Sequence, residues 1–232
     1  MKREPPSHAD DTRATAERLL DAAERLFGQL GYDGVGMRAL ADEARVNLGA
    51  ATYHFGSKEA LYIETFMRRF RPVEAERLQR LAHAEAEARA GGTPLTVERI
   101  VDCMVRPAYQ LGLEHPNFHT FLARSLFLPP PFLHEAICSE LEPHIQVFIT
   151  ALRRCLPKVE EDLIRLRYMF GMGAMLMFCV NTRTPVPIPS PILDECVLRE
   201  LIDFIAAGMG SHPKVAAKER PAIPWPPKAL RR

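Results

Sequence analysis

Apolar residues recur along most of this chain at the spacing of three and four residues that gives a helix one apolar face. The first such run starts at Thr12 and has its apolar positions at Ala16, Leu19, Leu20, Ala23, Leu26, Phe27 and Leu30. Gly31 supplies the stop that commonly follows a helix. No run keeps the strict alternation of polar and apolar residues that a half-buried strand needs, so the pattern predicts an all-α protein.

Helix breakers divide the rest of this pattern into further helices. We expect short helices over 37–44 and 48–55, and a longer one that Ser57 caps and that runs from residue 58 to Pro72. Later helices are expected over 74–89, 97–113, 118–128, 132–141, 145–156, 160–181 and 192–209. Pro107 lies inside one of these runs and should kink or interrupt it, because proline lacks a backbone N–H.

The pattern and the distribution of charge predict four segments. Residues 1–11 form a polar leader, 12–57 an N-terminal helical domain, 58–210 a larger helical domain, and 211–232 a basic tail rich in proline. We expect the leader and the tail to be disordered. The formal net charge of +1 argues against a protein that coats nucleic acid or membranes by bulk electrostatics. That total conceals a net charge of −4 over residues 72–211 and of +5 over 212–232.

Cysteine usage and hydropathy predict a cytoplasmic protein. The five cysteines are dispersed without any C-x-x-C spacing, which is typical of reduced thiols. The first residues are polar and lack the apolar region of a signal peptide. The longest uncharged apolar run, 168–180, is shorter than the roughly 20 residues that a membrane span needs, so we expect no membrane partner.

Residues 34–58, GVGMRALADEARVNLGAATYHFGSK, have the pattern of a helix, a tight turn and a second short helix. In a helix-turn-helix the second helix enters the major groove of DNA. Val46 is expected to plug the space between the two helices, and Asn47 to cap the second one. From Ala44 to Lys58 the chain holds no acidic residue and two bases, as a surface that faces phosphates requires.

A longer stretch, residues 12–62, resembles the DNA-binding domain of TetR/AcrR-type transcriptional regulators. The matching residues are Leu20, Ala23, Leu26 and Phe27; Gly31 and Tyr32; Arg38 and Ala41; and Tyr53, His54, Phe55, Lys58 and Leu61. The resemblance implies an N-terminal three-helix helix-turn-helix domain, followed by a larger helical domain for ligand binding and dimerisation.

The same resemblance implies a set of DNA contacts. Arg38 would reach a base or a phosphate, and Thr52 a phosphate or a thymine methyl group. The residues expected to line the base edges are Asn47, Leu48, Gly49 and Ala50. His54 and Lys58 would hold the DNA backbone, whereas Tyr53 would either pack over the helix or contact a phosphate.

Two positions depart from the family pattern. Arg45 stands in the turn where the family usually has glycine, so we expect local strain. Gly36 replaces the usual Ser or Thr cap of the first helix of the motif, which weakens that cap.

The larger domain is expected to form a homodimer and to bind an effector. The helix over 164–181 is apolar on nearly every face, so we expect it to pack against its own core and, with the last helix, against a second subunit. A purely intramolecular core is the alternative.

The expected effector pocket comprises Met104, Tyr109, Phe118, Phe121, Leu122, Met169, Met172 and Phe178, although such residues are also typical of plain core. The runs RYMFGMGAMLMF and FIAAGM resemble the PsrA-type subgroup, which implies an apolar, acyl effector.

These features predict a repressor that binds a palindromic operator as a homodimer and leaves it when a small apolar effector binds. The effector would shift the helix over 58–71 and so change the spacing of the two recognition helices. The alternative is a helical small-molecule-binding or scaffold protein without DNA activity. An enzyme is not expected, because no histidine follows a glutamate at the spacing of a di-iron site and no G-x-S-x-G occurs. We expect neither a cofactor nor a metal.

Overall fold

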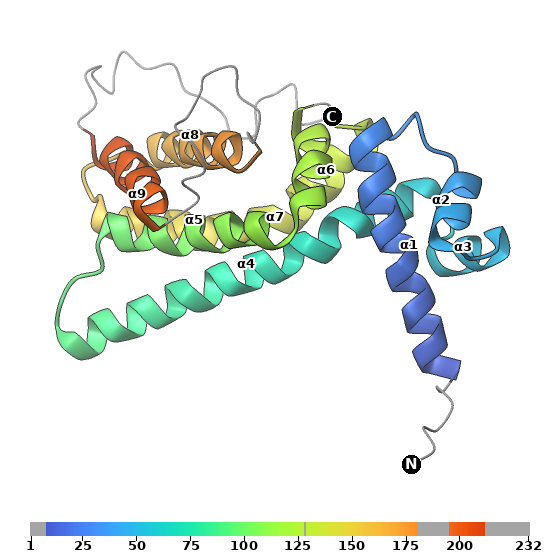
Figure 1. The fold of residues 1–232 in the computed structure, drawn as a ribbon. Helices are drawn as coiled ribbons and strands as arrows, with labels where there is room; N and C mark the ends of the chain where they lie inside the picture. The colour runs from blue at the N-terminus through green and yellow to red at the C-terminus, as the bar shows by residue number, and fades with distance from the viewer. Residues whose placement is uncertain (1–7, 128, 181–194, 212–232) are drawn as a thin grey trace. The chain divides into compact units, whose positions relative to one another are not determined.

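The computed structural model of this chain describes residues 8–127, 129–180 and 195–211, which form helices and their connections (Figure 1). The helices are α1 (His8–Leu30), α2 (Met37–Ala44), α3 (Leu48–Phe55), α4 (Lys58–Gly91), α5 (Val97–Glu114), α6 (Pro116–Phe127), α7 (Pro131–Cys155), α8 (Glu161–Val180) and α9 (Glu195–Gly210). The described residues contain no strand, so the all-α prediction is confirmed. Most of the predicted leader and nearly all of the predicted tail lie outside the described residues.

Prolines do not end helices where the sequence pattern placed the breaks. The helix expected to stop at Pro72 continues as α4 to Gly91, and the two helices expected on either side of Pro143 are one helix, α7. Pro107 likewise lies inside α5 without interrupting it. A proline removes one backbone hydrogen bond of a helix, at a cost of about 3 kcal/mol. Packing on both sides of the proline offsets this cost: in α4, Phe66 is fully buried before Pro72 and Leu81 is buried after it.

The described residues pack into two compact units that do not follow one linear division of the chain. Unit 1 consists of the residues up to Glu74 together with Leu111–Glu140, and unit 2 of Ala75–Gln110 together with the residues from Leu141 on. The helices α4, α5 and α7 therefore contribute residues to both units. The division of function at residue 57 stays a prediction, since packing and function need not share a boundary.

In unit 1, α6 completes the core of the helices that precede α4. The buried side chains of this core include Leu20, Phe27, Leu40, Tyr62, Phe66, Phe118, Phe121 and Leu133. Gly28 allows α1 and α6 to approach closely, because a Cβ atom there would lie 3.2 Å from the backbone nitrogen of Phe121. Arg124 of α6 also donates to the carbonyl of Gln29 at 2.9 Å, close to the end of α1.

Unit 2 has its own apolar core, with α8 and α9 packed against each other. Its buried residues include Leu81, Val101, Met104, Phe148, Ile164, Tyr168, Met175, Ile202 and Ile205. Gly171 of α8 lies tight against α9, since a Cβ atom at this position would be 2.8 Å from a methyl group of Ile205. Large apolar side chains of these two helices also remain exposed, namely Met169, Phe170, Met177 and Phe204.

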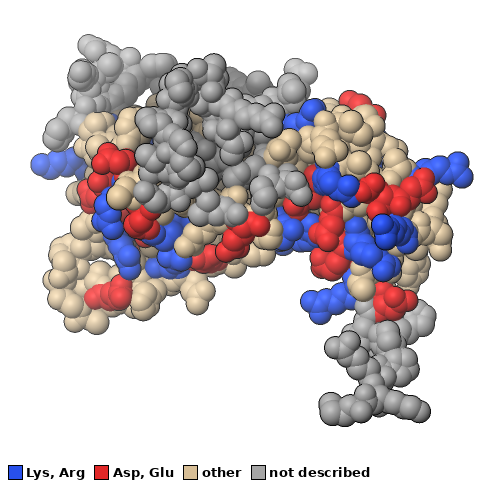
Figure 2. All heavy atoms as spheres, viewed as in Figure 1, with Lys and Arg blue, Asp and Glu red and all other residues tan. Residues whose placement is uncertain are grey.

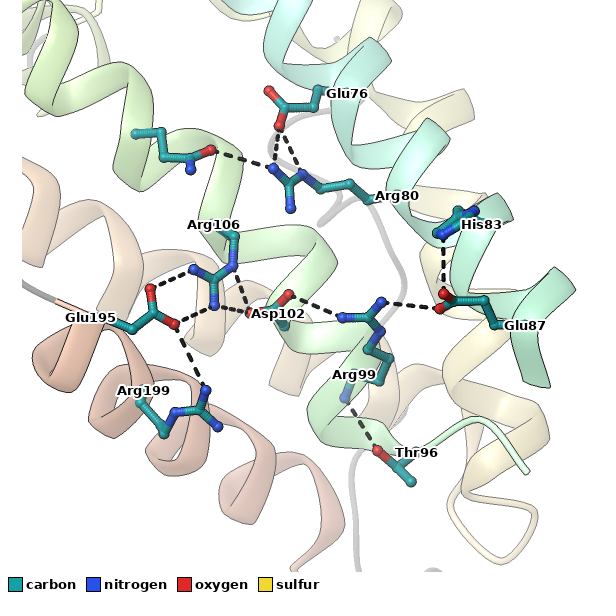
Figure 3. Close-up of polar contacts among 11 residues, drawn as sticks. Glu76, Arg80, His83, Glu87, Thr96, Arg99, Asp102, Arg106, Glu195 and Arg199 are labelled. Carbon is teal, nitrogen blue, oxygen red and sulfur yellow. Dashed lines mark hydrogen bonds and ion pairs between the residues drawn. The ribbon is translucent and has the colours of Figure 1, made fainter. Parts of the chain in front are cut away.

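A network of ion pairs joins α4, α5 and α9 at the surface of unit 2 (Figure 3). Arg106 of α5 forms two hydrogen bonds to the carboxylate of Glu195, at 2.7 and 2.8 Å, and also contacts Asp102. Arg99 continues the network to Glu87 of α4. Arg106 therefore connects α5 to the first residue of α9.

None of the helices in the described part of the chain is long and apolar enough to span a membrane.

Candidate nucleic-acid interface

The helix-turn-helix forms with the bounds that the sequence pattern predicts, and its caps explain why. Asn47 has extended backbone, and its side-chain oxygen accepts a hydrogen bond from the Ala50 N–H at 2.7 Å, which confirms the predicted cap of α3. Ser57 accepts in the same way from the Ala60 N–H at the start of α4. Gly36 precedes α2 and provides no side-chain cap, as expected.

Small residues bring α3 close to α1 and α2. The core between these helices consists of Leu19, Ala22, Ala41, Ala44 and Ala51, all buried. Val46 packs against this core from the turn, as predicted. Because Ala51 is the buried residue of α3, the opposite face of the helix points away from the core.

The outer face of α3 carries exposed, uncharged side chains. Leu48 is 44% exposed and Tyr53 is 82% exposed. The Thr52 hydroxyl donates to the carbonyl of Leu48 at 3.1 Å and is thereby used within the helix. Its methyl group is the part that remains for contact with a partner. The sequence left open whether Tyr53 packs over α3 or points outward, and its exposure favours the outward alternative.

Arg45 occupies the strained position that its place in the turn predicts. Its backbone is left-handed, with φ of 55° and ψ of 46°, and it is the one non-glycine residue with positive φ in the described part of the chain. Its backbone N–H bonds back to α2, at the carbonyl of Asp42. The side chain is exposed and lines a polar cleft of about 480 Å³ together with residues of α1, α2, α4 and the end of α5.

Two carboxylates that flank this surface have partners of their own. Glu43 of α2 forms an ion pair with Arg25 of α1, and Glu59 of α4 accepts a hydrogen bond from the Tyr32 hydroxyl at 2.6 Å. Basic and acidic side chains are interspersed over the described residues that face the viewer in Figure 2. The described residues on this face therefore show interspersed charge rather than a broad basic surface.

Lys58 lies against the loop between α1 and α2. Its ammonium donates to the carbonyl oxygens of Tyr32 and Val35, at 3.1 Å each, and its nitrogen is 3.9 Å from the centre of the Tyr32 ring. The side chain is half-buried. The phosphate contact of Lys58 stays a prediction, and in the chain without DNA its charge has these partners within the protein.

Tyr32 is held at both ends by neighbouring residues of α4. Desolvation, together with the hydrogen bond to Glu59, raises the pKa of the Tyr32 hydroxyl well above its ordinary value. The same hydrogen bond lowers the pKa of Glu59, so this carboxylate stays ionised. The Tyr32 ring also packs edge-on against Tyr62 and Phe132, with centroids 5.5 and 4.9 Å away.

The residues predicted for the effector pocket belong to two different cores. Met104 and Tyr109 are buried in the core of unit 2 and Met172 packs against that core, but Met169 is 42% exposed. Three residues of the predicted pocket lie instead in the core of unit 1, namely Phe118, Phe121 and Leu122. The helix of Phe178 is described, but its side chain lies outside the described residues.

Sequence reasoning missed two features of the interface. It did not predict that α6 packs into the core of unit 1. The assignment of α6 to the effector domain by function stays a prediction. Gly28, a buried glycine in the middle of α1, was the available signal for that close approach. It also gave Tyr32 no role beyond the family resemblance and did not consider Glu59, whereas the Tyr32 hydroxyl donates to Glu59 beside the loop before α2.

Both the N-terminal and the C-terminal part of the chain are similar to known proteins. Residues 19–65 match the model of bacterial regulatory proteins of the tetR family, and residues 102–208 match a tetracyclin repressor-like C-terminal domain. The transcriptional dual regulator CecR of Shigella flexneri is 30% identical over 149 residues, which cover 60% of this chain and 65% of CecR. The transcriptional repressor KstR of Mycolicibacterium smegmatis is 34% identical over 82 residues, which cover 35% of this chain and 37% of KstR.

A solved structure supports the fold. The TetR-family regulator HI0893 of Haemophilus influenzae superposes with a TM-score of 0.59 and 19% identity, over 84% of this chain and 98% of that one. An exposed, capped second helix is the element of a helix-turn-helix that enters the major groove in DNA-binding regulators of this class. The chain belongs to the TetR family of bacterial regulatory proteins.

Proposed function

We propose that this chain is a ligand-responsive transcriptional repressor, which binds a palindromic operator in double-stranded DNA as a homodimer in the cytoplasm. The observation that carries the proposal is the outer face of α3. It is exposed, free of carboxylates, and held on a small core by a capped N-terminus. A helix of this kind can enter the major groove without repulsion from the phosphates.

In this proposal α3 and its flanks supply the DNA contacts. The Leu48 side chain and the methyl groups of Ala50 and Thr52 suit thymine methyl groups. Arg38 on α2 is exposed and suits a phosphate or a guanine. The full set of proposed contacts is Arg38, Asn47, Leu48, Gly49, Ala50, Thr52, Tyr53, His54 and Lys58.

The exposed apolar side chains of α8 and α9 support a homodimer. Phe170 is 61% exposed and Phe204 is 72% exposed, and a two-fold interface over these helices would bury both. Such a dimer would place two α3 helices in successive major grooves, roughly 34 Å apart. Sedimentation of the protein as a monomer at micromolar concentration would refute this part.

Unit 2 is the proposed site of a small apolar effector, with acyl compounds as the first candidates. Met104 and Met172 give its core flexible side chains that can repack around a ligand. The helix α4 contributes residues to both units, so a change in unit 2 can reach the start of α4. The effector must bind the released state more tightly than the DNA-bound state, or no affinity changes.

Selection of operators from random double-stranded DNA tests the proposal. We expect an enriched palindrome, and a Tyr53→Ala or Arg38→Ala protein that binds it more weakly. Arg89→Ala, which removes an exposed arginine of unit 2, is the matched control and should bind as the wild type does. If no sequence is enriched, the chain is a helical small-molecule-binding or scaffold protein without DNA activity.

The same operator then tests the effector. Acyl compounds should release the DNA in a gel-shift assay and should be seen bound by native mass spectrometry. Release by none of these compounds would refute the acyl effector and leave the DNA-binding proposal in place.

A further inference from the structure

The polar cleft beside the turn that precedes α3 lies wholly within unit 1. Its walls come from α1, the end of α2, the turn at Arg45, α4 and the end of α5. Its volume of about 480 Å³ lies within the range of small-molecule sites, about 300–1,000 Å³. The residues that line it include none of the proposed DNA contacts, so the cleft is a separate feature of the unit.

Four arginines and four carboxylates line the cleft, and three of these carboxylates have arginine partners within the protein. Glu43 forms an ion pair with Arg25. Glu24 and Asp21 each accept a hydrogen bond from Arg68 at 2.8 Å. Most of the negative charge of the cleft is therefore already compensated by neighbouring arginines.

Two arginines of the cleft have no carboxylate partner within the described residues, namely Arg18 and Arg45. Arg18 donates to the hydroxyl of Thr15 at 3.0 Å, and the Arg45 side chain is exposed. Glu114, also exposed, is the one lining carboxylate without an arginine partner in this part of the chain. Two open guanidinium groups and one open carboxylate leave the cleft with a surplus of positive charge.

A third arginine, Arg69, is held in place at the cleft by a buried carboxylate. Its Nε donates at 3.0 Å to Glu24, whose side chain is 7% exposed, and its Nη1 lies 3.3 Å from the Nε2 of His115. Its Nη2 makes no hydrogen bond within the described residues. A guanidinium whose orientation is already fixed loses little rotamer freedom on binding, so Arg69 makes the site preorganised.

We propose that this cleft binds a small molecule with two carboxylate or phosphate groups, through Arg18, Arg45 and Arg69. A guanidinium binds either group through two parallel N–H bonds, so such a molecule supplies the partners that Arg18 and Arg45 lack. The site goes beyond the proposed function, because it takes a polar anion, whereas unit 2 is the proposed site of an apolar effector. Arg45 lies two residues before Asn47, the cap of α3, so a bound anion would restrain the turn from which α3 starts.

Calorimetric titration of the full chain with succinate and with inorganic phosphate tests the proposal. We expect at least one of these anions to bind saturably, once per chain, at constant ionic strength. Succinamide, the uncharged diamide of succinate, should not bind. Binding of neither anion would overturn the proposal, and so would an equal heat from sodium chloride at the same ionic strength.

Arg45→Gly is the decisive variant, because it removes the guanidinium together with the left-handed strain of an L-residue and so should not unfold the chain. We expect it to bind the anion at least about tenfold more weakly, the scale of one lost charged hydrogen bond. Arg38→Ala removes an exposed arginine of unit 1 outside the cleft and should bind as the wild type does. Equal affinity of Arg45→Gly and the wild type would refute the site.

Operator binding distinguishes a free anion from a DNA phosphate as the partner of Arg45. If the partner is a free anion, Arg45→Gly should leave the slope of log affinity against log salt concentration unchanged. A slope lowered by about 1 would place a DNA phosphate on Arg45 and overturn the assignment. If the wild-type protein selects no DNA at all, the proposed function fails, but the titration still decides whether the cleft binds an anion.

Discussion

The left-handed backbone of Arg45 predicts a substitution that stabilises the fold, whereas most point substitutions destabilise a protein. Replacing Arg45 by glycine relieves a conformation that costs an L-residue about 1–2 kcal/mol. Glycine loses more chain entropy on folding, which costs about 0.5–1 kcal/mol. We therefore expect Arg45→Gly to raise the free energy of unfolding by about 0.5–1 kcal/mol, or the melting temperature by about 1–4 °C.

The matched control is the same substitution at Arg38. Arg38 is also exposed, but it lies in the first turn of α2. Glycine in a helix costs up to about 1 kcal/mol, so Arg38→Gly should lower the stability. Urea denaturation followed by circular dichroism gives both values, provided that the slope of each transition is unchanged. Equal destabilisation by both substitutions would show that the backbone of Arg45 stores no strain.

Further predictions concern caps, close packing and pH. Asn47→Ala should cost about 1 kcal/mol by loss of the α3 cap, whereas an unchanged urea midpoint would show that the cap is redundant. Gly28→Ala should cost about 1–3 kcal/mol, because the new methyl group would push against the α6 backbone; a neutral effect would mean that the two helices separate freely. Phe121→Ala should cost about 3–5 kcal/mol, and a loss below 1 kcal/mol would contradict its place in the unit 1 core. The hydrogen bond from Arg106 lowers the pKa of Glu195, so this contact stabilises the fold above pH 4.5 and is lost on acidification through the lowered pKa. Glu195→Gln should reduce the pH dependence of stability in that range, and an identical profile would refute the contribution.

Local signals predicted the helix-turn-helix to the residue. The bounds of α2 and α3 follow from the apolar spacing, the Asn47 cap and the turn at Arg45, all of which act within a few residues. The continuity of α4 through Pro72 was not predictable in the same way. It depends on tertiary packing that offsets a lost hydrogen bond, and sequence spacing carries no information about that packing.

The partners of side chains were the hardest feature to predict. The spacing of Phe118 and Phe121 shows that α6 has an apolar face, but it does not show which core receives that face. Lys58 presents the same difficulty, since its carbonyl partners lie 23 and 26 residues earlier in the chain. A lysine at a helix start is compatible with a phosphate outside the protein or with a loop inside it. Coordinates are needed to find the partners within the protein.

The place of α6 in the core of unit 1 has a consequence for the order in which this protein can fold. During synthesis the helix-turn-helix leaves the ribosome long before Phe121 of α6, which packs against Phe27 and Tyr62. The DNA-binding unit therefore cannot complete its core until the chain has been made beyond α6, and the aromatic residues of α1 and α4 stay accessible to chaperones until then. For the same reason, a chimera that exchanges the segment up to Glu74 between family members would divide one apolar core between two parents.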